Sequence, residues 1–316
     1  MLNFVVSLTN DCSFCIMSEN INNDNIVGGD PQSVTPQKKS MAGKPFWVDA
    51  MVVVLLFIIA QAVATVACMA MGLRMPGVAM TTSFDAEVLE NADSMQARFI
   101  AITYLVSMVI FYISMFIYQR MRGWSSKGWF NMRGCTPVRL LAGYLLIWCI
   151  SIVVEPLSEA LPGDQDMLGN GGWLLFSSVL LAPIFEESLF RGYMTGILRK
   201  AYGGMAAWIV PAVTFGVIHA IPSVVISATL MGLVLGYLYL RYRSLGLVVM
   251  LHAMNNLTAC FLRMMDMGDM TVSGLLSEGP WYWALYAVCA VVLGVTFVKM
   301  YRNISGIKVE NNTSIE

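Results

Sequence analysis

Three short stretches of the sequence place ionisable or amide side chains inside otherwise apolar segments. They read APIFEESLFRGY, FGVIHA and LHAMNNL, and their polar members include Glu186, Glu187, Arg191, His219, His252, Asn255 and Asn256. Buried carboxylates and imidazoles serve general acid–base catalysis, metal binding or proton relay. The chain has only two histidines, and both belong to this set, which makes the set a candidate functional site.

Helical spacing gives these residues defined relations to one another. Glu187 and Arg191 are four positions apart, so they share a helix face and can neutralise each other. Glu186 points about 100° away from Glu187 and can face a different neighbour. His252 and Asn256 are also four positions apart, so they lie on one face of a later helix.

The predicted turn at Tyr202–Gly204 relates Glu186 to His219. Each of the two lies about 16 residues, or roughly 24 Å, from that turn, so they should meet at the same depth. His252 lies only about 8 residues, roughly 12 Å, past the turn near Ser244. It therefore comes beside Glu186 only if the first hairpin extends further into the cytoplasm.

The composition identifies the setting of these residues as a lipid bilayer. The 316 residues are 57% hydrophobic and 12% charged, whereas a soluble domain averages about 25% charged residues. The formal net charge of −1 provides no basic surface for phosphates, which argues against a nucleic-acid partner. Because apolar runs of about 18–25 residues can each cross a bilayer, the sequence predicts an all-α, polytopic membrane helix bundle.

About eight transmembrane helices are expected from hydropathy. They lie at Phe46–Gly72, Phe99–Tyr118, Val138–Val154, Trp173–Leu198, Met205–Ile221, Val224–Leu240, Leu245–Leu262 and Trp281–Lys299. Basic loops alternate with non-basic loops, as the positive-inside rule requires, so both termini are predicted to be cytoplasmic. In a bacterium this would be a multi-pass protein of the plasma membrane. Gly232 and Gly236 form a GxxxG pattern that favours a close helix crossing on the sixth span.

Four parts of the chain follow from this pattern. Residues 1–45 have the polar composition of a disordered cytoplasmic tail. Residues 46–172 carry the first three spans as accessory helices, and residues 173–263 carry helices four to seven with every candidate residue. Residues 264–316 hold the last span and a short cytoplasmic tail.

The ordered set of three motifs resembles the signature of the CPBP intramembrane proteases. This family comprises CAAX-prenyl-protease-like and bacteriocin-processing proteins and is also called the Abi family. The matching motifs are Glu186-Glu187-x-x-x-Arg191, Phe215-x-x-x-His219 and His252-x-x-x-Asn256. The flanking runs FRGY and GYLYLRYRSLGLVVMLHAMNNL are similar as well. The resemblance covers roughly Leu174–Cys260, and the remaining spans inherit nothing from it.

The resemblance implies hydrolysis of a peptide bond in a membrane-associated peptide or protein. In that reaction Glu186 would be the general base, activating a water molecule held with His219. His252 and Asn256 would donate hydrogen bonds to the oxyanion of the tetrahedral intermediate.

A zinc-dependent scheme uses the same residues. His219 and His252 with one carboxylate and an open water position form an established type of catalytic zinc site. The family is usually described as metalloproteases, yet a metal-free glutamate mechanism has been argued for its members, and the sequence leaves both open. In either scheme Glu187 with Arg191 would hold the helix and its carboxylates in place.

Two functions from other classes are also compatible with these residues. Buried Glu and His form proton relays in proton-coupled transporters, although the sequence shows no internal repeat of the kind that transporters have. A catalytically inactive family member, acting as a bacteriocin self-immunity or membrane scaffold protein, would keep the fold. Such a protein would not need the complete set of Glu, two His and Asn.

Overall fold

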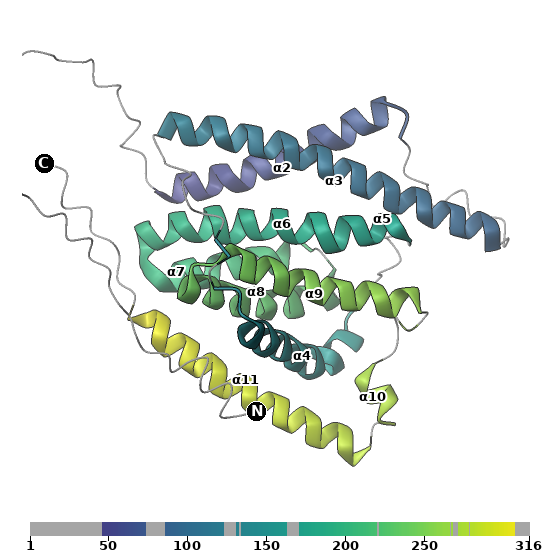
Figure 1. The fold of residues 1–316 in the computed structure, drawn as a ribbon, viewed down its shortest axis with the longest axis vertical. Coiled ribbons are helices and arrows are strands. Elements are labelled where there is room, and N and C mark those ends of the chain that lie inside the picture. Colours follow the sequence, from purple (N-terminus) through teal and green to yellow (C-terminus); the bar gives the residue numbers. More distant parts are fainter. Residues whose placement is uncertain are drawn as a thin grey trace, which may run out of the picture.

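The computed structural model describes residues 46–73, 86–122, 131–132, 134–162, 171–219, 221–265, 267, 271–277 and 279–306. The predicted tail of residues 1–45 lies outside the described residues, and the four-part division stays a prediction. Within the described ranges every regular element is a helix. The expected fold class, an all-α polytopic helix bundle, is therefore confirmed (Figure 1).

The helices follow one another along the chain with short connections in the second half. In order they are α2 (Phe46–Ala70), α3 (Ala86–Arg122), α4 (Pro137–Glu159), α5 (Gly172–Leu175), η3 (Phe176–Leu181), α6 (Ala182–Glu187), η4 (Ser188–Met194), α7 (Thr195–Val217), α8 (Pro222–Tyr242), α9 (Leu245–Met264), α10 (Val272–Leu275) and α11 (Pro280–Ser305).

Seven helices of the described chain are long and apolar enough to cross a bilayer. They are Val48–Ala70, Met95–Arg122, Pro137–Glu159, Gly172–Lys200, Pro222–Tyr242, Leu245–Met264 and Pro280–Ser305. The protein is thus an integral, multi-pass membrane protein. The expected span Met205–Ile221 is instead a shorter apolar helix, Tyr202–Val217. It is short because its two ends are fixed by turns: Gly203 has a non-helical φ of 79°, and the chain turns again before Pro222 starts α8.

The span that contains two π-helical segments lies at the centre of the bundle. The segment from α5 to η4 lies between the α2–α3 pair on one side and α9 on the other (Figure 1). α7 and α8 form a tightly packed antiparallel hairpin, and α4 and α11 cover its far side. The candidate residues therefore lie on helices that have neighbours on several sides.

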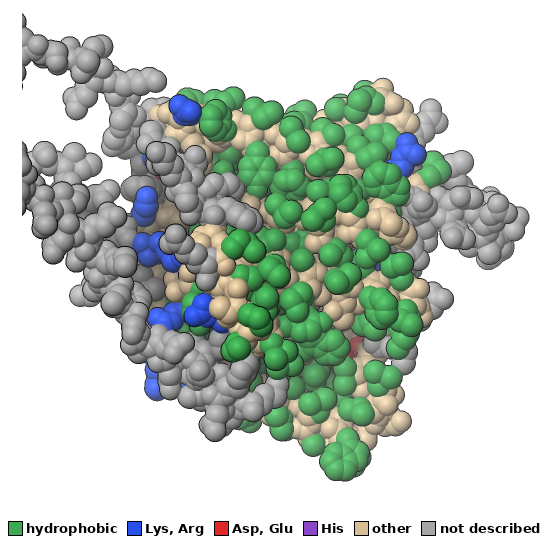
Figure 2. All heavy atoms as spheres, viewed as in Figure 1, with side chains coloured by type: hydrophobic (Ala, Val, Ile, Leu, Met, Phe, Trp, Pro, Cys, Tyr) green, Lys and Arg blue, Asp and Glu red, His purple; other side chains and the backbone are tan. Residues whose placement is uncertain are grey.

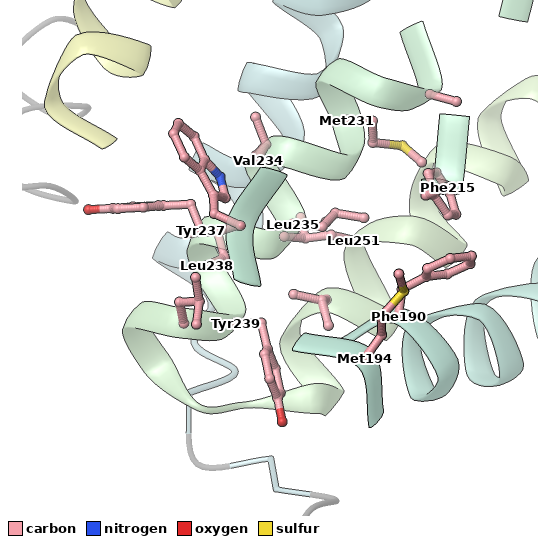
Figure 3. Close-up of a cluster of buried hydrophobic side chains, with 14 of the residues drawn as sticks. Phe190, Met194, Phe215, Met231, Val234, Leu235, Tyr237, Leu238, Tyr239 and Leu251 are labelled. Atoms are coloured by element: carbon pink, nitrogen blue, oxygen red, sulfur yellow. The ribbon is translucent and has the colours of Figure 1, made fainter. Parts of the chain in front are cut away.

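The hydrophobic core contains buried side chains of α2, α3, α4 and α11, together with those of η4, α7, α8 and α9. The last four elements meet in the part of the core that surrounds Phe215. Figure 3 shows side chains from these four elements, among them Phe190, Phe215, Leu235 and Leu251, pointing toward one another. The predicted close crossing is present at Gly232, where an added Cβ atom would lie 3.0 Å from the Cα atom of Ala212 on α7. This close approach lets α8 supply backbone groups to the interior of the bundle.

The outer surface has the distribution that a bilayer requires. Large hydrophobic side chains on the lipid-facing sides of α2, α3 and α11 are more than half exposed, for example Leu55, Ile113 and Val291. Figure 2 shows this apolar surface across the bundle, with most of the visible Lys and Arg side chains gathered at its left end. Because lipid tails solvate such side chains, their exposure costs no free energy in a membrane.

Candidate active site

Glu186 and Glu187 end α6, a single α-helical segment of six residues that lies between two wider, π-helical segments. The preceding segment is η3, and the following one is η4, which begins at Ser188 and contains Arg191. π-Helical turns widen a helix locally and occur most often at functional sites. Here they change the rotation of the helix just before and just after the two carboxylates.

Pro183 leaves one carbonyl of this irregular helix free to accept a hydrogen bond from α9. In η3 the backbone N–H of Ala182 donates to the carbonyl of Ser177, five residues earlier. Pro183 has no N–H, so it cannot supply the corresponding hydrogen to the carbonyl of Ser178. The Nδ2 atom of Asn256 on α9 donates to that carbonyl instead, at 2.8 Å. The proline thereby helps to join two of the three motifs.

Glu187 is the central acceptor of the site. Its Oε1 atom accepts hydrogen bonds from Arg191 Nη1 at 2.9 Å and from His252 Nδ1 at 2.9 Å. The side chains of Glu187 and Arg191 are completely buried, as their shared helix face predicted, and that of His252 is nearly so. Because a buried charge is very costly alone, each member of this trio depends on the others.

Arg191 also reaches the α7–α8 hairpin. Its Nη2 atom donates to the carbonyl of Gly232 at 2.9 Å. Its guanidinium carbon lies 5.0 Å from the centre of the Phe215 ring, within the range of a cation–π contact. The same ring contacts His219 and His252, with centroid distances of 4.9 and 5.6 Å. Phe215 is therefore the buried side chain around which the three motifs meet.

Glu186 faces away from Glu187, toward the other ring nitrogen of His252 and toward Tyr104. Its Oε2 atom lies 3.9 Å from His252 Nε2, and its side chain is 15% exposed. Its Oε1 atom accepts a hydrogen bond from the hydroxyl of Tyr104 on α3, at 3.1 Å. Glu186 is thus the more accessible of the two carboxylates, and it lies beside His252, as expected if the first hairpin extends past α9.

His219 is held separately, just after the end of α7. Its Nδ1 atom lies 2.7 Å from the carbonyl of Phe215, one turn earlier. A carbonyl can only accept, so Nδ1 carries the hydrogen and Nε2 is the free ring nitrogen. The predicted water shared by His219 and Glu186 stays a prediction.

The hydrogen positions on His252 follow from its partners. A carboxylate that pairs with a guanidinium accepts hydrogen bonds, so Nδ1 of His252 donates to Glu187. Nε2 then accepts in the neutral ring and donates only when the ring is doubly protonated. The predicted role of His252 as an oxyanion donor therefore requires the doubly protonated imidazolium form.

A zinc site was expected to use His219 and His252 with a carboxylate. In the described ranges no group of three or more His, Cys, Asp or Glu side chains is placed to hold a metal ion. Each histidine offers Nε2, but Nε2 of His252 is directed to Glu186 while His219 is anchored to the Phe215 backbone. The residues as placed do not fit a preformed three-ligand zinc site.

One functional contact was missed by the sequence analysis. Tyr104 lies on α3, in a span outside the three motifs, and no local pattern distinguishes it from other aromatic residues of apolar helices. Only the tertiary contact between α3 and the η3–α6 segment brings its hydroxyl to Glu186.

Comparisons with known proteins agree with the motifs. Residues 169–258 match the family described as type II CAAX prenyl endopeptidase Rce1-like. The Bacillus subtilis (strain 168) protein named "Putative membrane peptidase YdiL" is 27% identical over 99 residues. The segment 169–258 is thus similar to proteins of the CPBP type. The resemblance inferred from the three motifs is thereby confirmed.

The extent of these matches defines the CPBP core. The family match spans α5, η3, α6, η4, α7, α8 and most of α9, and it contains all the motif residues. The alignment with the Bacillus protein covers 31% of this chain and 41% of that relative, so less than half of either protein is compared. No solved structure was found to match the chain.

Proposed function

We propose that this protein is an intramembrane endopeptidase that hydrolyses a peptide bond in a membrane-associated peptide or protein. The observation that carries the proposal is the pair of contacts made by His252, 2.9 Å to Glu187 and 3.9 Å to Glu186. A fixed, buried carboxylate orients the imidazole, and a second, more accessible carboxylate lies across from its free nitrogen. This is the arrangement that general base catalysis requires.

The first step uses the space between Glu186 and His252. A water molecule can hydrogen-bond to two atoms that are 3.9 Å apart, since each bond needs only about 2.8 Å. Glu186 Oε2 takes a proton from this water while its oxygen forms a bond to the substrate carbonyl carbon. The carbonyl oxygen becomes an oxyanion, which the imidazolium form of His252 stabilises through Nε2–H.

The second step returns the proton. Glu186, now protonated, gives its hydrogen to the amide nitrogen as the C–N bond breaks, which leaves a carboxyl and an amine product. Asn256 lies one turn beyond His252, and one hydrogen of its amide group is not needed for the bond to Ser178. We assign this hydrogen to the oxyanion as well, and we assign His219 to the water.

The experiment compares membranes from cells that produce the wild-type protein or the Glu186→Gln variant. Mass spectrometry of peptide termini should find new termini, within or beside membrane segments, only with the wild-type protein. Glu159→Gln, at the exposed end of α4, is the matched control and should give the wild-type pattern. Identical termini from wild type and Glu186→Gln would contradict the proposal and leave transport or scaffolding as the function.

A further inference from the structure

Tyr104 connects an accessory helix to the proposed general base. It lies on α3, outside the 169–258 segment that matches the CPBP family. Its hydroxyl donates to Glu186 Oε1 at 3.1 Å. A phenol hydroxyl is a good donor to a carboxylate, because the acceptor is charged and the bond is stronger than one between neutral groups.

The ring of Tyr104 is itself fixed by packing. It meets the ring of Phe185 at a centroid distance of 6.0 Å and an angle of 68°, an edge-on arrangement. Tyr112, two helical turns further along α3, also contacts the Phe185 ring, at a centroid distance of 5.6 Å. Phe185 directly precedes Glu186, so two aromatic side chains of α3 pack against the residue next to the proposed base.

The position of α3 is in turn set by a buried polar contact with α2. Asp49 on α2 accepts hydrogen bonds from Tyr118 and, at 2.6 Å, from Arg122 near the end of α3. Asp49 is completely buried, so this contact resists sliding of one helix along the other. The hydroxyl of Tyr104 therefore contacts Glu186 from a helix, α3, whose position is fixed against α2.

The two carboxylate oxygens of Glu186 consequently have different partners. Oε1 is occupied by the Tyr104 hydroxyl, and Oε2 faces His252 Nε2. Without the tyrosine hydroxyl the carboxylate can rotate about its terminal bond, because rotation of a carboxylate about χ3 meets only a low barrier. The tyrosine thus selects the rotamer in which one oxygen points at the water site.

We propose that Tyr104 is a positioning residue, which holds the Glu186 carboxylate so that Oε2 faces the water and His252. This inference rests on the proposed function of Glu186 as general base. It assigns part of the active site to α3, so the CPBP core alone would be an incomplete enzyme. Tyr104 acts through Glu186 and does not itself touch the substrate.

Tyr104→Phe tests the inference in the full-length protein reconstituted in lipid vesicles with a peptide substrate found by the terminus comparison. The change keeps the ring contact with Phe185 and removes only the hydroxyl. We expect kcat to fall about 10- to 100-fold, the size of effect that a misplaced catalytic group produces. KM and the thermal unfolding temperature should stay at their wild-type values.

Tyr112→Phe is the matched control on the same helix. It contacts the same Phe185 ring, but its hydroxyl interacts with Ser188 and not with Glu186. This variant should keep kcat within about twofold of the wild type. A second test places Tyr104→Phe in the Glu186→Asp background, where the shortened carboxylate no longer reaches the hydroxyl. There the tyrosine change should alter kcat by less than about twofold.

The outcomes separate this inference from the proposed function. The positioning role would be overturned by an equal kcat for Tyr104→Phe and Tyr112→Phe. It would also be overturned if a lower unfolding temperature explained the loss of activity in Tyr104→Phe. In either case an inactive Glu186→Gln variant would still support the endopeptidase proposal. A full Tyr104→Phe effect in the Glu186→Asp background would also overturn it, since the tyrosine would then act independently of Glu186. Full activity of Glu186→Gln would overturn both.

Discussion

At the scale of single residues, the site is organised by the different environments of two adjacent carboxylates. Glu187 is completely buried between Arg191 and His252, whereas Glu186 is partly exposed and has a neutral hydroxyl and an imidazole as neighbours. In the proposed reaction the first carboxylate orients other groups, and the second exchanges a proton with water. One dipeptide would then supply both an orienting group and the general base.

The Glu187–Arg191 pair provides a first prediction. Glu187→Ala leaves a buried guanidinium unpaired, and Arg191→Ala leaves a buried carboxylate with one partner fewer, each of which costs about 3–5 kcal/mol. Both variants should unfold at lower temperature and lose activity. The double variant should cost clearly less than the sum, because it leaves neither charge behind. Thermal unfolding of all four proteins in detergent measures this cycle, and strict additivity would show that the pair does not interact.

The second prediction concerns metal. Because no three donors converge in the described part of the chain, activity should survive exhaustive chelation, and elemental analysis should find well below one zinc per chain. His219→Ala should still abolish cleavage, because we assign His219 to the water that attacks the substrate, while the protein accumulates normally. About one zinc per chain in the wild type, absent from the His219→Ala and His252→Gln variants, would establish a metal centre instead.

Some side-chain contacts of the site could be predicted from the sequence, and others could not. The Glu187–Arg191 contact follows from spacing along one helix, so it was predictable. The contact of His252 with Glu187 and that of Tyr104 with Glu186 join distant parts of the chain, so their partners depend on how the helices pack. The sequence located the candidate residues and one pair among them, but it could not assign the hydrogen-bond partners that come from other helices.

At the scale of helices, close backbone approach and local widening bring the motifs together. α8 comes near enough to the interior for the Gly232 carbonyl to accept from Arg191, and the π-helical turns set the direction of the two carboxylates. The sequence predicted the glycine contact, because GxxxG is a helix-packing pattern. It did not predict the π-helical segments, since their apolar residues fit a regular α-helix equally well.

Gly232→Ala provides the prediction at this scale. The added Cβ atom would lie 3.0 and 3.1 Å from the Cα and carbonyl oxygen of Ala212, which are backbone atoms that cannot rotate away. The hairpin must separate, which should cost about 1–3 kcal/mol and weaken the Arg191 bond to the Gly232 carbonyl. Thermal unfolding and cleavage rate should therefore fall together.

Gly294→Ala is the control for this change. An added Cβ atom at Gly294, in the middle of α11, would meet nothing within 4 Å. Because alanine favours the helix over glycine, this variant should be at least as stable as the wild type. If the two glycine variants behave alike, the contact between α7 and α8 is not as tight as described.

At the scale of the whole molecule, the number of helices that cross the membrane decides whether the two termini lie on the same side. Seven helices of the described residues are long enough to span the bilayer, and the shorter helix Tyr202–Val217 must also cross it for both termini to lie on one side. The alternation of basic and non-basic loops predicts eight crossings, and this number stays a prediction. Hydropathy alone could not give the reduced length of this helix, since its end depends on the turn before Pro222.

Thiol labelling of intact cells tests this orientation. Ser277 precedes α11 and Ser305 is its last residue, and both are exposed, so the predicted topology places them on opposite sides of the membrane. With an impermeant reagent, Ser277→Cys should be labelled from outside and Ser305→Cys only after permeabilisation. A reporter fused to the N-terminus should lie on the Ser305 side. The reverse labelling, or termini on opposite sides, would contradict eight crossings.

The central claim is that Glu186 activates the water that hydrolyses the peptide bond. Its most direct test is incorporation of ¹⁸O from labelled water into the new carboxyl terminus of a membrane peptide, cleaved by purified protein in lipid vesicles. The wild type should incorporate label at every cleavage, and Glu186→Gln should be slower by about 10²–10⁴-fold, with Glu159→Gln unchanged. Undiminished label incorporation by Glu186→Gln would contradict the account.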